Sequence, residues 1–146
     1  MQLYTHPKLK LSIEEVDGIK YFKKIWSGIV NTVVFRDLIK NTLKIYEREI
    51  PKLNNPTDKI LILTDASGLE LIRREDIVWL MEEIEPIYGE LGLTHQALIP
   101  PKAMRIQDLV DLYVGSREEV TFYNYPFLTE EEGIAWYLES VKKEST

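Results

Sequence analysis

The residue types that could do chemistry follow three predicted strands, at the carboxyl end of each. Asp65, Ser67 and Gly68 come directly after one short apolar run. Lys102 comes shortly after a second run, and Tyr123 lies at the end of a third. Ligands of open α/β sheets gather beyond the carboxyl ends of parallel strands, where helix N-termini favour anions. We therefore predict that these five residues form a site for a ligand or a protein partner.

Asp65 allows three reactive roles, because it ends a predicted buried strand: a base, a metal ligand or a phosphoryl acceptor. Against them, Asp and Ser in an Asp-x-Ser-Gly sequence commonly bond to backbone N–H groups of their own turn. No second carboxylate stands nearby at a spacing typical of metal ligands. We favour the turn-stabilising interpretation over the reactive ones.

Several classes of catalytic and cofactor site are excluded by residues that the sequence lacks. There is no cysteine, and His6 and His95 are the only histidines, so a structural zinc site has too few ligands. Neither a Gly-x-Ser-x-Gly elbow nor a glycine-rich nucleotide motif occurs. We predict no metal, no cofactor and no catalytic residue, and we expect His95 in a loop or at a strand edge. The chain is predicted not to be an enzyme.

The spacing of apolar residues predicts the elements that position these side chains. Asp17-Gly18 is a strong two-residue turn signal, and it joins residues 11–16 and 19–26 in an antiparallel hairpin. Helical and strand patterns then alternate, which requires parallel strands joined by helices. Predicted helices span residues 35–50, 77–91, 106–114 and 129–141, and predicted strands span residues 60–64, 96–99 and 120–123. The fold class is α/β, with a mixed sheet of four to five strands, the hairpin at its edge and about four helices.

Length and composition bound the organisation of the chain. The 146 residues, 45% of them hydrophobic, suit one domain that spans residues 1–146. No apolar stretch approaches the roughly 20 residues that cross a bilayer, and the first residues carry no signal-peptide pattern. We expect a cytoplasmic protein without a transmembrane segment.

The net charge of −6 argues against a nucleic-acid partner, which demands surplus Lys and Arg. The charge is unevenly distributed along the chain. Residues 1–59 carry 11 Lys and Arg against 7 Asp and Glu, a net +4, and residues 60–146 carry 7 against 17, a net −10. Unlike charges would attract two copies of the chain to each other, and the basic part leaves an anionic partner open.

Three tryptophans are candidates for an interface with a partner: Trp26, Trp79 and Trp136. Trp79 and Trp136 stand beside the apolar faces of their predicted helices and not within them. Partial burial at the margin of the sheet is the simpler interpretation. The functional one is an apolar contact patch, because tryptophan and tyrosine are enriched in interface cores.

Four junctions of the sequence carry a family resemblance. They are Ile25-Trp26-Ser27-Gly28 at a strand end, Leu63-Thr64-Asp65-Ala66-Ser67-Gly68 after the central strand, the segment 92–100, and the acidic, Trp-containing last helix at 129–138. Their order resembles the STAS family, in its SpoIIAA-like (STAS/SEC14-type) bacterial branch. The likeness spans about residues 13–138 and implies a SpoIIAA-like, STAS-like two-layer fold.

The resemblance implies a regulatory module that works by binding a protein partner or a second copy of itself. It also implies a phosphorylated serine at the start of the helix after the Asp-x-Ser turn. The corresponding residues here, Arg73-Arg74-Glu75-Asp76, contain no hydroxyl, so a phosphoserine switch is not carried over. The alternative, which the SEC14-type branch implies, is a carrier of a small apolar or anionic ligand, such as a lipid.

Overall fold

The chain opens with three antiparallel strands, β1 (Gln2–His6), β2 (Leu9–Val16) and β3 (Ile19–Ile29). Asp17 and Gly18 have φ angles of 51° and 76°, the positive values that a two-residue hairpin turn requires. The predicted hairpin is therefore confirmed. It does not form the sheet edge, however, because β1 lies outside β2 and β3 continues inward to β4.

The rest of the sheet is parallel. The computed structural model describes residues 1–102, 104–105, 108 and 122–144. Its strands follow in sequence order from β1 to β6, and β3 to β6 run parallel to one another. The further elements are α1 (Thr32–Glu49), a 3-10 turn (Ile50–Lys52), β4 (Leu61–Leu71), α2 (Arg74–Trp79), a π-helical turn (Leu80–Ile84), α3 (Glu85–Leu91), β5 (His95–Ile99), β6 (Tyr123–Pro126) and α5 (Glu130–Glu144).

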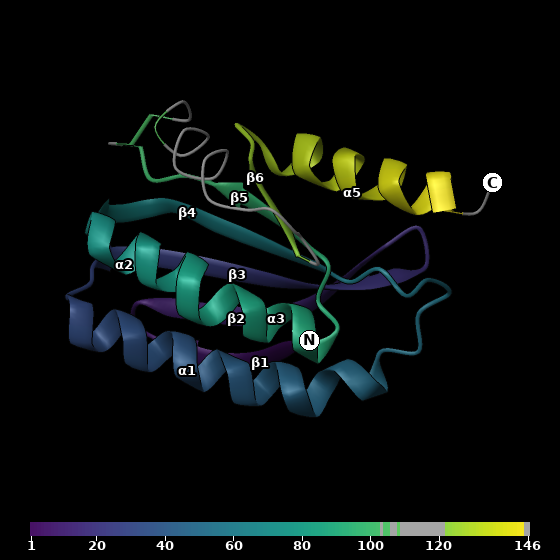
Figure 1. The fold of residues 1–146 in the computed structure, drawn as a ribbon, viewed down its shortest axis with the longest axis horizontal. Helices are drawn as coiled ribbons and strands as arrows, with labels where there is room; N and C mark the ends of the chain where they lie inside the picture. The colour runs from purple at the N-terminus through teal and green to yellow at the C-terminus, as the bar shows by residue number, and fades with distance from the viewer. Residues whose placement is uncertain (103, 106–107, 109–121, 145–146) are drawn as a thin grey trace.

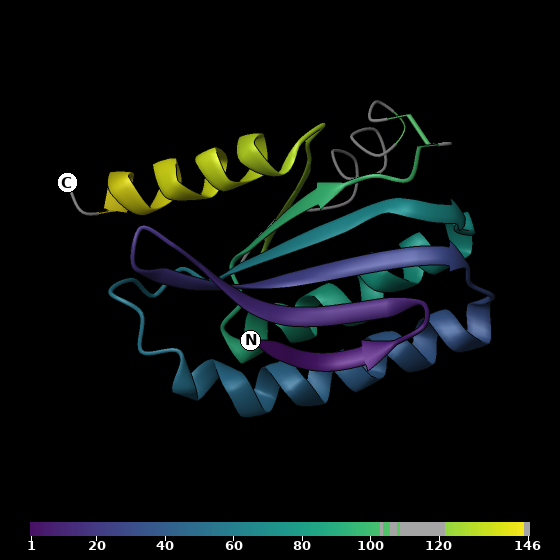
Figure 2. The same ribbon diagram turned by 180° about the vertical axis from the view of Figure 1, so that it is seen from behind.

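Helices cover both faces of the sheet. In Figures 1 and 2, α1 and the α2–α3 helix lie on one face and α5 lies on the opposite face. Successive strand residues alternate between the two cores: Ile62 packs toward α1, whereas Leu61 and Leu63 pack toward α5. The predicted α/β class is confirmed, with six strands in place of four to five and with α5 as a third layer.

The predicted helix at residues 106–114 lies outside the described residues, as do the first two residues of the strand predicted at 120–123. The described part of that last strand, β6, begins at Tyr123 and not before it. None of the described helices is long and apolar enough to cross a membrane.

The Asp-x-Ser sequence lies within a strand and not in a turn. Strand β4 continues past Asp65 to Leu71, and it pairs with β3 throughout. Between the pairs Ile25↔Asp65 and Ser27↔Gly68, β4 holds one residue more than β3, so the strand contains a β-bulge. The turn expected at this place is wrong, because pairing with β3 extends the strand beyond its apolar run.

The helix after β4 contains a π-helical turn whose cause is visible in the sequence. Pro86 has no N–H to donate, and its ring would collide with the carbonyl four residues before it. Just before Pro86, the N–H of Glu85 donates to the carbonyl of Leu80, five residues back. This wider turn shifts the register of the residues that follow it. Glu85 and Tyr88 are both buried.

Candidate ligand-binding site

A pocket lies between the sheet and the layer formed by α1, α2 and α3. Sheet residues of β3, β4 and β5 form its floor, and it extends past the end of β5 to Pro101 and Met104. Its empty space is about 610 Å³, part of it open to solvent, and the part that can hold water measures about 60 Å³. That is room for about four water molecules. Its walls are mostly apolar: Trp26, Phe35, Ile39, Leu69, Leu80 and Leu98.

Lys24 lines this pocket although it carries an amine. Its side chain on β3 is 1% exposed. The Nζ atom donates to the hydroxyl of Tyr88 over 3.3 Å, and it lies 5.5 Å from the ring centroids of both Tyr46 and Tyr88. Among the described residues no carboxylate forms an ion pair with it. The amine is therefore buried with one long hydrogen bond and two aromatic rings.

Burial lowers the pKa of Lys24 from 10.5 to about 7, because an ammonium loses its hydration in the core. The surrounding tyrosines do not compensate with negative charge, since burial raises the pKa of Tyr46 and of Tyr88 well above the ordinary value. Near neutral pH, Lys24 is present in both its charged and its neutral form.

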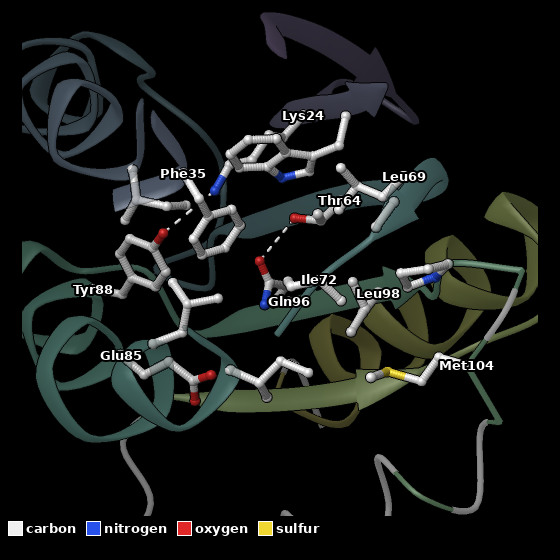
Figure 3. A pocket seen from close by; sticks show the side chains of 16 residues that line it. Lys24, Phe35, Thr64, Leu69, Ile72, Glu85, Tyr88, Gln96, Leu98 and Met104 are labelled. Carbon is white, nitrogen blue, oxygen red and sulfur yellow. Dashed lines mark hydrogen bonds between the residues drawn. The ribbon is translucent and has the colours of Figure 1, made fainter. Parts of the chain in front are cut away.

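Two polar side chains of neighbouring strands face the same pocket. The Thr64 hydroxyl on β4 donates to Oε1 of Gln96 on β5 over 2.7 Å. Figure 3 shows both side chains among those that line the pocket, with the amide nitrogen of Gln96 turned away from Thr64. This hydrogen bond fixes the amide so that its NH₂ group remains as a donor.

Glu85 brings a carboxylate to the wall of the pocket from the start of α3. It is buried, and Nδ2 of Asn124 on β6 donates to its Oε2 over 2.9 Å. In Figure 3 its carboxylate lies at the other end of the pocket from the Lys24 amine. The pocket therefore has a basic end at β3 and an acidic end at α3.

A buried ion pair holds α2 against α1 beside the pocket. Asp76 is buried and accepts from Nε of Arg36 over 3.2 Å and from the hydroxyl of Thr32 over 3.0 Å. The Arg36 guanidinium lies 4.9 Å from the ring centroid of Trp79. Since Ile77 on α2 lines the pocket, this contact positions one of its walls.

None of the five site residues predicted from the sequence lines this pocket. Oδ1 of Asp65 accepts from the N–H of Ser67 over 3.0 Å and from its hydroxyl over 2.6 Å. These are local bonds at the β-bulge. Gly68 lies where β4 approaches β3 closely, because a Cβ there would come within 2.8 Å of the Trp26 carbonyl oxygen.

Tyr123 does not lie beside Asp65. It pairs with His95 at the start of β5, and His95 pairs with Leu61. Asp65 pairs with Ile99, four residues further along, which is about 13 Å at the rise of a strand. Lys102 is exposed in the turn after β5. A joint ligand site of these residues stays a prediction, but the structure separates Tyr123 from Asp65 and Ser67.

The three candidate interface tryptophans have different surroundings. Trp26 is 3% exposed and stacks on Phe35 at 4.9 Å between ring centroids, so it belongs to the core and offers no surface. Trp79 and Trp136 are half-buried. Trp136 packs against Phe127 and His95, at centroid distances of 5.3 and 4.9 Å. Only Trp79 and Trp136 retain surface for a partner.

His95 is an inner-strand residue, so the loop or edge position expected for it is wrong. It is buried on β5, between β4 and β6, where Trp136 and Tyr137 of α5 cover it. Its Nδ1 lies 2.8 Å from the Thr94 hydroxyl. Burial, followed by the nearby Lys59, lowers the pKa of His95 to about 4. In the described part of the chain, no group of three His, Asp or Glu side chains could hold a metal ion.

The sequence pattern did not predict which residues line the pocket, although it contains one indication that a lysine is buried. Lys23 and Lys24 are adjacent in a strand, and adjacent side chains of a strand point to opposite faces. With both faces covered, at least one of the two must enter a core. Lys23 reaches Glu130 of α5 in an ion pair of 2.8 Å, and Lys24 enters the other core alone.

The fold is similar to a solved structure, an uncharacterised protein of the DUF3478 family with a SpoIIAA-like fold from Shewanella loihica PV-4. The TM-score is 0.57 at 12% sequence identity, and the alignment covers 92% of this chain and 98% of that one. No family model matches the sequence, and no curated protein matches it. The chain thus has the SpoIIAA-like α/β fold that the resemblance implied.

Proposed function

We propose that the chain is a non-enzymatic module that binds a small molecule in the pocket between the sheet and the α1–α3 layer. The observation that carries this proposal is the burial of Lys24 in a mostly apolar pocket, with no ion-pair partner among the described residues. Small-ligand sites typically combine apolar walls with a few converging polar groups. The geometry therefore supports best the small-ligand carrier, which the sequence analysis gave as the alternative to a regulatory module.

The shape of the pocket limits the ligand to a slender molecule. Space for about four waters accepts a short alkyl chain or a single ring and not a bulky polycyclic compound. Burial of the ligand's apolar surface would supply most of the binding free energy, at about 25 cal/mol per Å². We therefore expect weak to moderate affinity for compounds of about six carbons.

The test is a titration with 1-hexanol, a neutral probe, followed through the backbone amide chemical shifts. Ala66 is buried and lines the pocket, so Ala66→Leu fills space that the probe needs. We expect this variant to lose at least about tenfold in affinity, since it excludes the probe's buried CH₂ groups. Ala135→Leu, at an exposed position of α5, is the matched control and keeps the wild-type affinity.

Two results would contradict the proposal. One is 1-hexanol that shifts no amide of the pocket walls. The other is equal binding by the wild type and the Ala66→Leu variant, provided that the variant unfolds as cooperatively as the wild type. Native mass spectrometry of gently isolated protein tests the same proposal, and we expect a small molecule to accompany the chain.

A second candidate function is protein binding at β6, the last strand of the described sheet. Tyr123 and Tyr125 of this strand are 51 and 52% exposed, and Leu128 just after it is 71% exposed. Trp136 packs beside Tyr125, which extends the aromatic surface onto α5. An edge strand offers unpaired backbone groups, and aromatic residues commonly anchor interfaces. This observation supports the regulatory role expected from the sequence, with a partner protein or a second copy.

Sedimentation velocity at micromolar concentration tests the self-association arm of this second candidate. We expect a dimer that Tyr125→Lys converts to monomer, whereas Tyr4→Lys on the opposite edge strand leaves it intact. A monomer for the wild-type chain would remove the dimer. The cytoplasmic location and a regulatory role stay predictions.

A further inference from the structure

Lys24 has more hydrogen-bonding capacity than its surroundings use. An ammonium group carries three donors, and the described residues accept from one of them, at the Tyr88 hydroxyl. Two N–H groups of the charged form therefore lack a described acceptor. A buried donor without an acceptor costs free energy, which a ligand oxygen would recover.

Gln96 presents donors to the same pocket. Its Oε1 is occupied by the Thr64 hydroxyl, and no described residue accepts from its Nε2. The side chain is buried and lines the same pocket as Lys24 and Tyr88. In Figure 3 its amide nitrogen lies on the side of the carbonyl oxygen away from the Lys24 amine. The hydrogen-bonding capacity that Lys24 and Gln96 leave unused consists of N–H groups. Such a group of donors is complementary to an anion that only accepts.

From this arrangement we infer that the pocket takes an apolar monocarboxylate, with its carboxylate on the Lys24 amine and its chain along the apolar walls. The inference rests on the proposed small-molecule function and adds the chemical class of the ligand. The shared chemistry is one carboxylate on a slender apolar body, whether the body is an alkyl chain or an aromatic ring.

The charged and titratable groups around Lys24 favour an anion at its end of the pocket. On α1 the neighbour is Tyr46, and on α3 the neighbours are Tyr88 and Glu85. The burial that raises the pKa of both tyrosines keeps them neutral. Glu85 lies at the far end of the pocket and accepts from Asn124. A carboxylate beside Lys24 would hold the amine in its charged form.

The primary test compares hexanoate with 1-hexanol at pH 6, by titration of backbone amide chemical shifts. The two probes share a chain length and differ in charge. We expect hexanoate to bind at least about tenfold more tightly, since a charge-assisted hydrogen bond is about twice as strong as a neutral one. Lys24→Met removes this preference and retains 1-hexanol binding. Benzoate in place of hexanoate distinguishes an aromatic body from an alkyl one.

The pH dependence of hexanoate binding supplies a second readout. The amine must be charged to hold the carboxylate, and its pKa in the free protein is about 7. We expect the affinity for hexanoate to fall about 100-fold between pH 6 and pH 9, one factor of ten for each unit above that pKa. The affinity of 1-hexanol, and that of hexanoate for the Lys24→Met variant, should stay level over the same range.

Two further variants keep the inference falsifiable if Lys24→Met does not fold. Gln96→Glu places a negative charge in the same pocket as the proposed carboxylate with almost no change of shape, so hexanoate affinity should fall at least about tenfold. Glu85→Gln replaces the carboxyl group at the other end of the pocket with an amide of similar shape and should not lower hexanoate affinity. Gln96→Glu should change the affinity for 1-hexanol less than it changes the affinity for hexanoate.

Two outcomes would overturn the inference and leave the proposed function standing. One is equal affinity for hexanoate and 1-hexanol, with both probes excluded by Ala66→Leu. The other is hexanal that borohydride reduction fixes on Lys24 while hexanoate does not compete, which would assign the amine to a carbonyl ligand. If neither neutral nor charged probes reach the pocket, the proposed function fails together with the inference.

Discussion

The Tyr88 hydroxyl accepts the one hydrogen bond that the Lys24 amine makes to the described residues, across 64 positions of the sequence. The two side chains come from the sheet and from the helix that covers it. Their contact lies at the wall of the pocket, where no carboxylate of the described residues forms an ion pair with the amine. This pair therefore combines a cost in stability with a capacity to bind an anion.

The cost of burying Lys24 should appear as a pH-dependent stability. Below pH 7 the buried amine of the folded protein is charged. The shift of its pKa from 10.5 to about 7 means that this buried charge costs on the order of 5 kcal/mol of stability. Between these two pKa values the unfolded chain binds the proton and the folded chain does not, so stability rises with pH. Lys24→Met should therefore be more stable than the wild type by several kcal/mol at pH 6, and this gain should disappear towards pH 10. Urea unfolding at the two pH values measures it.

Lys23→Met is the matched control, because Lys23 is the adjacent residue and points to the other face. Its hydrogen bond with Glu130 raises the pKa of Lys23, so its contribution to stability is constant from pH 6 to pH 10 and is lost only above that range. If the effect of Lys24→Met on the free energy of unfolding were as independent of pH as that of Lys23→Met, the Lys24 amine would have to be either exposed or paired with a negative charge.

The fold class was accessible from the sequence because its signals are local. The apolar periodicity lies within single elements, and the Asp17-Gly18 turn joins two consecutive strands, so both signals could be recognised from neighbouring residues. Strand β1 was not predicted, because no residue of Gln2–His6 is buried and the segment therefore shows no alternation of apolar and polar residues. The extension of β4 escaped because its cause, pairing with β3, is a contact between distant segments.

The pocket could not be predicted, because its polar groups come from different elements. Lys24, Gln96 and Glu85 belong to β3, β5 and α3, and nothing in their spacing brings them together. His95 was misplaced for the same reason, since its burial depends on Trp136 and Tyr137 more than 40 residues later. Two local signals could have helped: the adjacent pair Lys23-Lys24 in a strand, and Pro86 inside a helix.

His95 should remain uncharged well into the acidic range. Burial and the nearby Lys59 lower its pKa to about 4, whereas an unfolded histidine titrates near 6.5. The unfolded chain therefore binds an extra proton between pH 4 and pH 6.5, and stability falls as the pH decreases through this range. Between pH 6.5 and pH 4, the free energy of unfolding of His95→Gln should therefore decrease by about 3 kcal/mol less than that of the wild type.

Proton NMR of the two imidazole rings checks the His95 assignment directly. The His95→Gln spectrum identifies which resonances belong to that ring, with His6→Gln as the control. A His95 resonance that titrates near pH 6.5 in the folded protein would contradict the burial of its ring.

Gly133 allows α5 to approach β5 closely. A Cβ at this position would come within 2.7 Å of the Ala97 Cβ. In an isolated helix, glycine to alanine stabilises by about 1 kcal/mol, but here we expect Gly133→Ala to destabilise by about 1–3 kcal/mol because the core is overpacked. Ala135→Gly at an exposed position of the same helix should cost about 1 kcal/mol through propensity alone. A stabilised Gly133→Ala variant in urea unfolding would show that α5 does not pack this closely.

The Arg36–Asp76 ion pair should hold α2 closed over the pocket. Asp76 is buried, so removing Arg36 leaves a charge that only the Thr32 hydroxyl offsets among the described residues. Breaking a buried pair on one side commonly costs about 3–5 kcal/mol, and here we expect the lower part of that range because Arg36 is half-exposed. Arg36→Met should therefore destabilise the protein and increase local opening of α2.

Hydrogen exchange measures where that opening occurs. We expect the amides of α2 (Arg74–Trp79) to exchange at least about tenfold faster in Arg36→Met than in the wild type, which corresponds to about 1.4 kcal/mol of local stability. The middle of α1 should change less, since its apolar face remains packed on the sheet. Arg48→Met is the matched control on the same helix. Arg48 is exposed and its partner Glu49 keeps a second ion pair with Lys52, so exchange in α2 should not change. A uniform increase throughout the chain would mean that Arg36 supports the whole fold and does not hold α2 in particular.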